Sequence, residues 1–303
     1  MSLPSYSGII TVLTTPLSAD GKIAFDVLGC HIDWLLSQGV TSILEGGSTG
    51  EYYVQTMDER KALLAFVAEH VNGRAQLIAG TNAVRPDDTL ALNAYVETLG
   101  YESVMLAAPF YALPNTQELV THFRRVAEAT RLGVILYNFP ARTGVDMSPE
   151  FLDGVRDIQN IHAVKESSGS FARSVEHVLN FPHLARICGA DDQALDAFLW
   201  GAQSWIAGAS NFLPAEHVAL WRACVERQDF LLGRRIMQAM MKMIYLLEQG
   251  GKYIQYVKYG VELAGFAVGQ TRAPLGGLEP DEKAAFKALY DDVKAACLPA
   301  LLA

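Results

Sequence analysis

The chain has 303 residues, of which 50% are hydrophobic, and its 33 acidic and 24 basic side chains give a formal net charge of −9. This much apolar content can fill a sizeable core and excludes an intrinsically disordered chain. The acidic balance, without a cluster of Lys or Arg, argues against nucleic acid or an anionic membrane surface as a partner, because both need a concentrated positive field.

The N-terminus and the cysteines predict a cytoplasmic protein. Residues 1–5 lack the basic start and apolar run of a signal peptide, and no apolar run reaches the roughly 20 residues that span a bilayer. The four cysteines lie far apart without a C-x-x-C pair, and a chain of this length does not need disulfides. We therefore expect an unprocessed protein in a reducing compartment.

Short β-branched or aliphatic runs alternate with longer segments whose apolar residues recur every three or four positions, as far as Pro214. The expected strands are Gly8–Leu13, Ser42–Glu45, Gln76–Ala79, Ser103–Ala107, Gly133–Tyr137, His162–Lys165, Ala185–Cys188 and Ser204–Ala207. The clearest helical segments between them are Phe25–Gln38, Met57–His70, Pro86–Leu99 and Gln117–Thr130. This order predicts an α/β protein with a (β/α)₈ TIM barrel rather than a doubly wound sheet, for which the dinucleotide-binding glycine fingerprint is missing.

After Pro214 the sequence predicts only helices. These are Ala215–Arg227, Phe230–Gln249, Tyr253–Ala264 and Pro280–Ala296. A barrel needs a single closing helix, so we predict a barrel over residues 1–225 that carries the active site, followed by a C-terminal helical region over residues 226–303.

Lys165 is the most informative polar residue, because it ends an otherwise apolar strand, and barrel active sites lie at the carboxyl ends of the strands. Partial desolvation there favours the free amine that attacks a ketone in Schiff-base chemistry. The alternative from this segment alone is a lysine that reaches to the rim or pairs with Glu166.

Further polar residues follow other strands. Tyr111 and Tyr137 offer phenols for proton relay, although each alone is also typical of a core aromatic residue. The turn Gly46–Gly50 offers backbone amides and two hydroxyls to a carboxylate, or it simply connects a strand to a helix. Arg142 provides a planar fork for a second carboxylate, or forms a surface ion pair.

Other chemistries find no support in the sequence. The seven histidines form no H-x-H or H-E-x-x-H spacing, Gly250–Tyr253 lacks the pattern of a phosphate-binding loop, and no G-x-S-x-G elbow occurs. The sequence therefore predicts an enzyme without a metal or an organic cofactor.

Together these motifs resemble the dihydrodipicolinate synthase/N-acetylneuraminate lyase family of pyruvate-dependent class I aldolases, and most closely its dihydrodipicolinate synthase-like members. The resemblance covers nearly the whole chain. It is carried by Gly8–Pro16, Gly47–Glu51, Pro109–Tyr111, Tyr137–Gly144 and Val164–Glu166.

The resemblance implies a role for each candidate residue. Lys165 would form the imine with pyruvate or a related 2-oxo acid, and Tyr137 would be the general acid and base above it. Ser48 and Thr49 would bind the pyruvyl carboxylate, with Gly47 and Gly208 also in the substrate-binding set. Ser48 would link Tyr137 to Tyr111, which would come from a neighbouring subunit. The resemblance thus implies an oligomer, commonly a homotetramer built as a dimer of dimers.

The resemblance leaves two second substrates open. Arg142 followed by Thr143-Gly144 resembles the synthase branch, in which the arginine holds the carboxylate of aspartate semialdehyde. The segment Trp205–Pro214 looks more like catabolic relatives that cleave, dehydrate or deaminate sugar-derived or hydroxyproline-derived 2-oxo acids. Regulation also departs from the bacterial synthases, because Met57, Arg60, Val84 and Phe110 replace common residues of their lysine-inhibitor site, so we expect no feedback inhibition by lysine.

A hypothesis from a different functional class is a silent barrel, that is, a non-catalytic protein that binds a 2-oxo acid without reacting with it. Such a module needs the carboxylate pocket but neither the nucleophile nor its base. Because Lys165 and both tyrosines are present, we favour the lyase.

Overall fold

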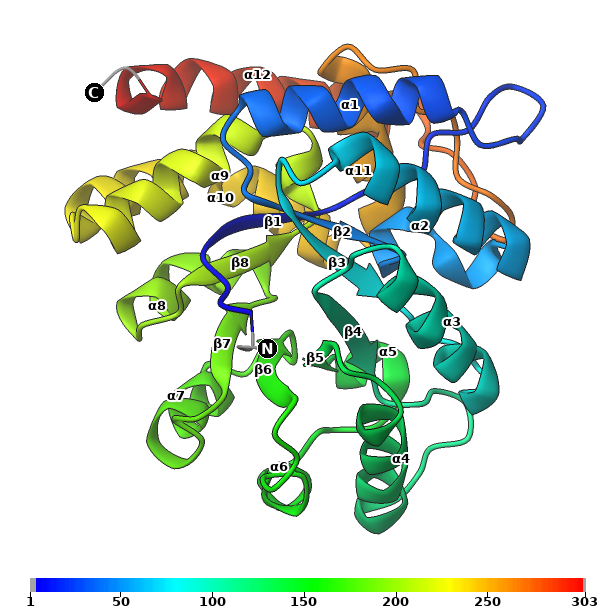
Figure 1. Ribbon diagram of the computed structural model, residues 1–303. Helices are drawn as coiled ribbons and strands as arrows, with labels where there is room; N and C mark the ends of the chain where they lie inside the picture. Colours follow the sequence, from blue (N-terminus) through cyan, green and yellow to red (C-terminus); the bar gives the residue numbers. More distant parts are fainter. Residues whose placement is uncertain (1–3, 302–303) are drawn as a thin grey trace.

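Eight parallel strands close into a barrel in which each strand pairs with the next along the chain and β1 pairs with β8 (Figure 1). The computed structural model describes residues 4–301. The strands are β1 (Gly8–Val12), β2 (Ser42–Glu45), β3 (Gln76–Gly80), β4 (Ser103–Ala107), β5 (Gly133–Asn138), β6 (Ile161–Glu166), β7 (Ala185–Cys188) and β8 (Ser204–Ala207). The predicted TIM barrel is confirmed, and each strand matches its predicted bounds to within one residue.

Helices surround the barrel and continue beyond it (Figure 1). They are α1 (Phe25–Ser37), α2 (Met57–Val71), α3 (Pro86–Thr98), α4 (Thr116–Glu128), α5 (Pro140–Thr143), α6 (Pro149–Gly154), α7 (Phe171–Asn180), α8 (Ala194–Leu199), α9 (Pro214–Trp221), α10 (Phe230–Gln249), α11 (Tyr253–Leu263) and α12 (Pro280–Leu301). The predicted helix 215–227 is corrected in one respect. Its α-helical part ends at Trp221, and a π-helical turn over Arg222–Glu226 follows.

Local sequence explains where the surrounding helices begin. Thr56 before α2 accepts a hydrogen bond from Glu59 N, and the Glu59 carboxylate accepts one from Thr56 N in return. Asn115 and Glu118 form the same reciprocal arrangement at the start of α4. These capping boxes satisfy amides that the first helical turn would otherwise leave unpaired.

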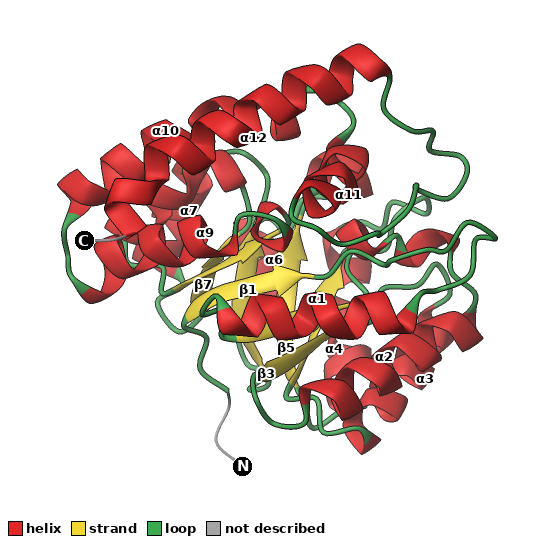
Figure 2. Ribbon diagram, turned by 90° about the horizontal axis from the view of Figure 1, so that it is seen from above, coloured by secondary structure: helices red, strands yellow, loops and turns green. Residues whose placement is uncertain are grey.

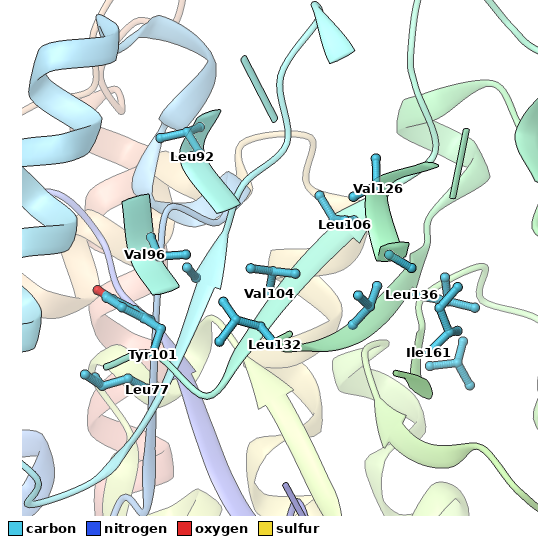
Figure 3. Packing of buried hydrophobic residues seen from close by; sticks show 14 of the residues in the cluster. Leu77, Leu92, Val96, Tyr101, Val104, Leu106, Val126, Leu132, Leu136 and Ile161 are labelled. Carbon is cyan, nitrogen blue, oxygen red and sulfur yellow. The ribbon is translucent and has the colours of Figure 1, made fainter. Parts of the chain in front are cut away.

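Two layers of apolar side chains hold the barrel together. Alternate strand residues such as Ile10, Ile78 and Ile135 fill its interior, because successive side chains of a strand point to opposite faces. The other face packs against the helices, as Figure 3 shows for Val104 and Leu106 of β4 with Leu92 and Val96 of α3 nearby. Side chains therefore fill the barrel interior below the strand ends.

The C-terminal helices extend this core. Helices α10, α11 and α12 pack on one another, and α10 and α12 also pack on α9 (Figure 2). One cluster of buried residues includes Trp205 of β8, Met240 of α10 and Val257 of α11. The proposed division after residue 225 stays a prediction. Within residues 4–301, the helices are too short or too polar to cross a membrane.

Candidate active site

Strands β5 and β6 place the predicted nucleophile and its base side by side. Tyr137 and Lys165 are register partners across the two parallel strands, and both side chains point into the barrel. The Lys165 Nζ atom lies 4.1 Å from the centroid of the Tyr137 ring, and each residue is only 7% exposed. A lysine in this position is withdrawn from solvent rather than extended to the rim.

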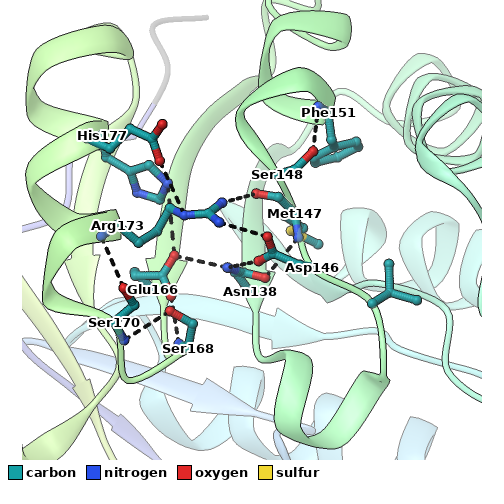
Figure 4. Close-up of polar contacts among 12 residues, drawn as sticks. Asn138, Asp146, Met147, Ser148, Phe151, Glu166, Ser168, Ser170, Arg173 and His177 are labelled. Atoms are coloured by element: carbon teal, nitrogen blue, oxygen red, sulfur yellow. Dashed lines mark hydrogen bonds and ion pairs between the residues drawn. The ribbon is translucent and has the colours of Figure 1, made fainter.

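Glu166 occupies the opposite face of β6 and does not pair with Lys165. Figure 4 shows its carboxylate among Asn138, Ser168 and His177. It accepts hydrogen bonds from Asn138 Nδ2 at 3.1 Å and from Ser168 N at 2.6 Å. The alternative in which Glu166 neutralises the lysine is therefore wrong, because strand alternation sends the two side chains to opposite sides. Glu166 instead ties the ends of β5 and β6 together behind the candidate site.

The turn after β2 brings two hydroxyl residues to the barrel mouth. Ser48–Gly50 forms a 3₁₀ turn, and Gly50 O accepts hydrogen bonds from Thr15 Oγ1 and Gln55 Nε2, each at 2.7 Å. A side chain at Gly47 would collide with Val12 of β1, so this glycine permits the close approach of the turn to the barrel. The turn is thus held rigidly against the strands.

Most of the predicted site residues meet around one cavity of about 300 Å³. The predicted residues that line it are Ser48, Thr49, Tyr137, Arg142, Lys165 and Gly208. A second cavity of about 580 Å³ adjoins it and shares Ser48, Tyr137 and Arg142. The site is therefore a two-part hollow, with the lysine in the smaller part.

Arg142 stands at the edge of both cavities. It lies in the short helix α5 directly after β5, it is exposed, and its guanidinium lies 5.1 Å from the centroid of the Phe139 ring. This placement leaves the planar fork available to an anion that enters the mouth.

Two predicted residues do not line these cavities. Gly47 is buried beneath the turn, where its role is to let the turn approach β1. Tyr111 is 94% exposed and has a backbone φ of 73°, in the left-handed region that a tyrosine rarely adopts. A single chain therefore does not bring the Tyr111 phenol to Lys165.

Sequence reasoning missed three residues of the mouth, namely Asp191, Glu248 and Tyr253. Asp191 follows β7 and is buried, and it accepts hydrogen bonds from Trp205 Nε1 at 2.9 Å and from Tyr253 OH at 2.7 Å. The phenol of Tyr253 passes directly over Gly208, where any β-carbon would collide with it. The strand-end rule could have found Asp191, whereas Glu248 and Tyr253 lie on C-terminal helices and carry no local signal.

Two carboxyl groups, those of the buried Asp191 and the half-buried Glu248, dominate the electrostatics on this side of the cavity. The backbone amide of Asp191 donates to Glu248 Oε1 at 3.4 Å, which brings the two side chains together. Burial, followed by the charge of Asp191, raises the pKa of Glu248 to about 7. Burial also raises the pKa of Asp191, although its two donors and the Lys165 charge oppose that effect.

Of the positions that differ from the lysine-inhibitor pattern, Phe110 lines the larger cavity, and Arg60 contacts Asn82, which also lines it. Arg60 is buried, and its guanidinium donates to Asn82 O at 2.7 Å and to Gly80 O at 2.9 Å. Val84 is 66% exposed.

Among residues 4–301, His, Cys, Asp and Glu side chains form no group of three that could hold a metal ion.

Comparison with known proteins supports one family. A model of the dihydrodipicolinate synthetase family matches residues 5–293. A protein named 4-hydroxy-tetrahydrodipicolinate synthase from Exiguobacterium sibiricum is 35% identical over 89% of this chain and 92% of its own length. The 4-hydroxy-tetrahydrodipicolinate synthase of Methylacidiphilum fumariolicum SolV superposes with a TM-score of 0.92 and 26% identity, over 98% of each chain.

A third relative carries a different name. YagE of Escherichia coli K12 was solved in complex with pyruvate, and it superposes with a TM-score of 0.90 and 27% identity over 95% of this chain and 99% of its own. Its name proposes a 2-dehydro-3-deoxy-D-gluconate aldolase activity. The relatives thus share one fold, but their names refer to different reactions.

Proposed function

The chain belongs to the dihydrodipicolinate synthetase family, whose members are aldolase-type lyases, and we propose that it joins pyruvate to an aldehyde, or reverses that reaction, through an imine on Lys165. The observation that carries this proposal is the pair of Lys165 and Tyr137, buried side by side in a cavity with Ser48 and Thr49. A 2-oxo acid is the substrate class for which this set is suited, because it offers a ketone to the amine and a carboxylate to the hydroxyl turn.

Imine formation uses the lysine and the tyrosine in turn. The free amine of Lys165 attacks C2 of pyruvate, and the carbinolamine then loses its hydroxyl as water to leave an iminium. Tyr137 carries protons to and from the carbinolamine oxygen. The iminium withdraws electrons, so the Tyr137 oxygen, which has given its proton to the departing water, can remove a C3 proton. The resulting enamine carbon is the nucleophile toward the aldehyde.

Ser48 and Thr49 hold the pyruvyl carboxylate in this scheme. Both line the cavity that contains Lys165, and hydrogen bonds from Thr15 and Gln55 fix the turn that carries them. Fixed donors fit a carboxylate without reorganisation during the reaction. The pyruvate complex of YagE supports the choice of pyruvate as the first substrate to test.

Tyr111 completes the proton relay from a second copy of the chain in this proposal, which makes the active form an oligomer and, by family resemblance, a homotetramer. Its exposed phenol and left-handed backbone support the assignment, because such strain persists where the surroundings impose it. Mixing inactive Lys165→Ala and Tyr111→Phe chains tests it. Restored activity after subunit exchange supports a shared site, and no restoration despite exchange contradicts it.

For the second substrate, the synthase-like assignment is aspartate semialdehyde, whose carboxylate Arg142 would hold. A specific observation also favours the catabolic alternative. The larger cavity of about 580 Å³ is lined by the polar side chains of Glu248, Gln255 and Asn82, which suit a hydroxylated sugar-acid chain. Turnover of aspartate semialdehyde with pyruvate, compared with cleavage of 2-dehydro-3-deoxy-D-gluconate, distinguishes the two.

Covalent trapping tests the proposed imine directly. The protein is incubated with pyruvate and sodium borohydride and then measured by intact-protein mass spectrometry and peptide mapping. We expect one reduced adduct on Lys165, none in Lys165→Ala, and an unchanged adduct in Lys287→Ala, which removes an exposed lysine of α12. Reversible pyruvate binding without an adduct would instead identify a silent barrel.

A further inference from the structure

Glu248 is a carboxyl group of the mouth that takes no part in the imine-forming steps described above. It lies one residue before the end of α10 and lines both the cavity of Lys165 and the larger cavity beside it. One of its oxygens accepts the backbone amide of Asp191. Glu248 therefore stands where a molecule bound in the larger cavity meets a nucleophile formed on Lys165.

Asp191 and Glu248 differ in how their charges are stabilised. Both side-chain oxygens of Asp191 receive strong donors, the Trp205 indole and the Tyr253 phenol, so Asp191 is suited to the ionised form. Within the part of the chain that the structure describes, the Glu248 carboxylate accepts one hydrogen bond, from the Asp191 backbone amide at 3.4 Å, and its ionised form would face the charge of Asp191. The hydrogen bonds therefore favour the ionised form more strongly at Asp191 than at Glu248, whose pKa is raised to about 7 by burial and by the charge of Asp191.

The charged and titratable side chains around Glu248 come from three elements. Asp191 and Asp192 of the turn after β7 favour its neutral form, and Lys165 of β6 favours its carboxylate. Tyr253 of α11 donates its phenol to Asp191 and keeps that carboxylate in place. Conversion of the lysine to an imine with pyruvate keeps a positive charge nearby, so Glu248 can exist in either form during turnover.

We propose that Glu248 is the proton donor and acceptor for the reacting oxygen of the second substrate. This inference rests on the proposed aldolase function and concerns the step that follows imine formation. In the direction of synthesis, the enamine carbon attacks the aldehyde carbon, and the carbonyl π electrons move to oxygen. That oxygen takes the proton of Glu248. The C=C π electrons of the enamine form the new carbon–carbon bond, and the nitrogen lone pair forms the C=N bond of the iminium again.

Cleavage is the same step in reverse. The Glu248 carboxylate removes the hydroxyl proton, the carbon–carbon bond breaks into the iminium, and the aldehyde leaves. The neighbouring groups are less suited to this task. The Tyr137 ring lies against Lys165, the Tyr253 phenol is committed to Asp191, and the Arg142 guanidinium offers hydrogen-bond donors but no acceptor.

The test compares Glu248→Gln with three assays on the full-length protein. Borohydride trapping reports imine formation, and loss of the pyruvate C3 protons into D₂O, followed by NMR, reports enamine formation. Turnover with aspartate semialdehyde, or cleavage of 2-dehydro-3-deoxy-D-gluconate, reports the complete reaction. Glu128→Gln is the matched control, since Glu128 lies exposed on α4, away from the mouth.

We expect trapping and C3 exchange to stay within about 3-fold of wild type in Glu248→Gln, while turnover falls about 10²–10⁴-fold. Glu248→Asp should recover part of that loss, because it restores an exchangeable proton. Near-normal turnover in Glu248→Gln overturns the inference, and so does a parallel fall in trapping and exchange, which would assign Glu248 to the imine or to folding.

Failure of the underlying proposal gives a different result. If wild-type protein forms no adduct with pyruvate, the imine itself is refuted, and the role of Glu248 is refuted with it. If wild-type protein traps pyruvate but turns over neither probe, the aldol step proposed for Glu248 is overturned while the imine stands.

Discussion

Replacement of Lys258 by Met should destabilise the protein and weaken pyruvate binding together. Lys258 of α11 and Glu51, two residues after Thr49, form an ion pair at 2.8 Å, and the two side chains are only 3% and 2% exposed. Glu51 also accepts the backbone amide of Arg272 at 2.8 Å, and Lys258 donates to Gln270 O at 2.9 Å. The pair thus joins the turn Ser48–Gly50 to the C-terminal helices.

The size of the effect follows from burial. At a separation of 2.8 Å, an effective dielectric constant of about 20 gives a gross attraction of about 6 kcal/mol, much of which offsets the desolvation of both groups. Removing the ammonium leaves the Glu51 carboxylate uncompensated, and we expect a loss of about 3–5 kcal/mol in unfolding free energy. For a chain of 303 residues that corresponds to a fall in Tm of roughly 5–8 °C.

A double-mutant cycle measured by urea denaturation checks this reasoning. Lys258→Met and Glu51→Gln should each destabilise, and the double variant should lose at least about 2 kcal/mol less than the sum of the two, because it leaves no unpaired charge. The KM for pyruvate should rise in Lys258→Met more than kcat falls, since the turn carries Ser48 and Thr49. Additive losses of stability, or an unchanged KM, would refute the link between the pair and the turn.

Three further predictions concern single residues. Burial raises the pKa of Glu45 from its ordinary 4.5 to about 7, so the folded state binds more protons than the unfolded state between those values, and the Glu45 contribution to stability decreases as pH rises through this window. Glu45→Gln should therefore raise the free energy of unfolding at pH 8, by about 3 kcal/mol at most, and by much less at pH 4.5. Equal changes in the free energy of unfolding at both pH values, measured by urea denaturation, would contradict this. Tyr137→Phe should fold normally and lower steady-state turnover by about 10²–10⁴-fold, and near-wild-type turnover would remove its acid–base role. Gly208→Ala should displace the Tyr253 phenol from Asp191 at a cost of about 1–3 kcal/mol, and adding Tyr253→Phe should recover part of the thermal stability if the clash is the cause.

Much of the fold could be predicted because its signals are local. The run from Gly133 to Tyr137 reads as a strand from its own β-branched and aliphatic residues, and the helix from Met57 carries its own start signal in Thr56 and Glu59. The rule that barrel chemistry lies at the carboxyl ends of strands then selected Lys165 and Tyr137 without any knowledge of packing. The family resemblance is confirmed by the match over residues 5–293.

The sequence by itself therefore determined the barrel, the family and the pairing of a lysine with a tyrosine at two adjacent strand ends. Only the tertiary structure decided what surrounds that pair. Glu248 and Tyr253 contact Asp191 although they lie 57 and 62 residues after it in the sequence. Lys258 likewise contacts Glu51, although most of the barrel strands lie between these two residues in the sequence. Such contacts depend on how the C-terminal helices pack over the strand ends. The periodicity and spacing of residues within one short segment cannot predict which side chains from distant segments this packing brings together.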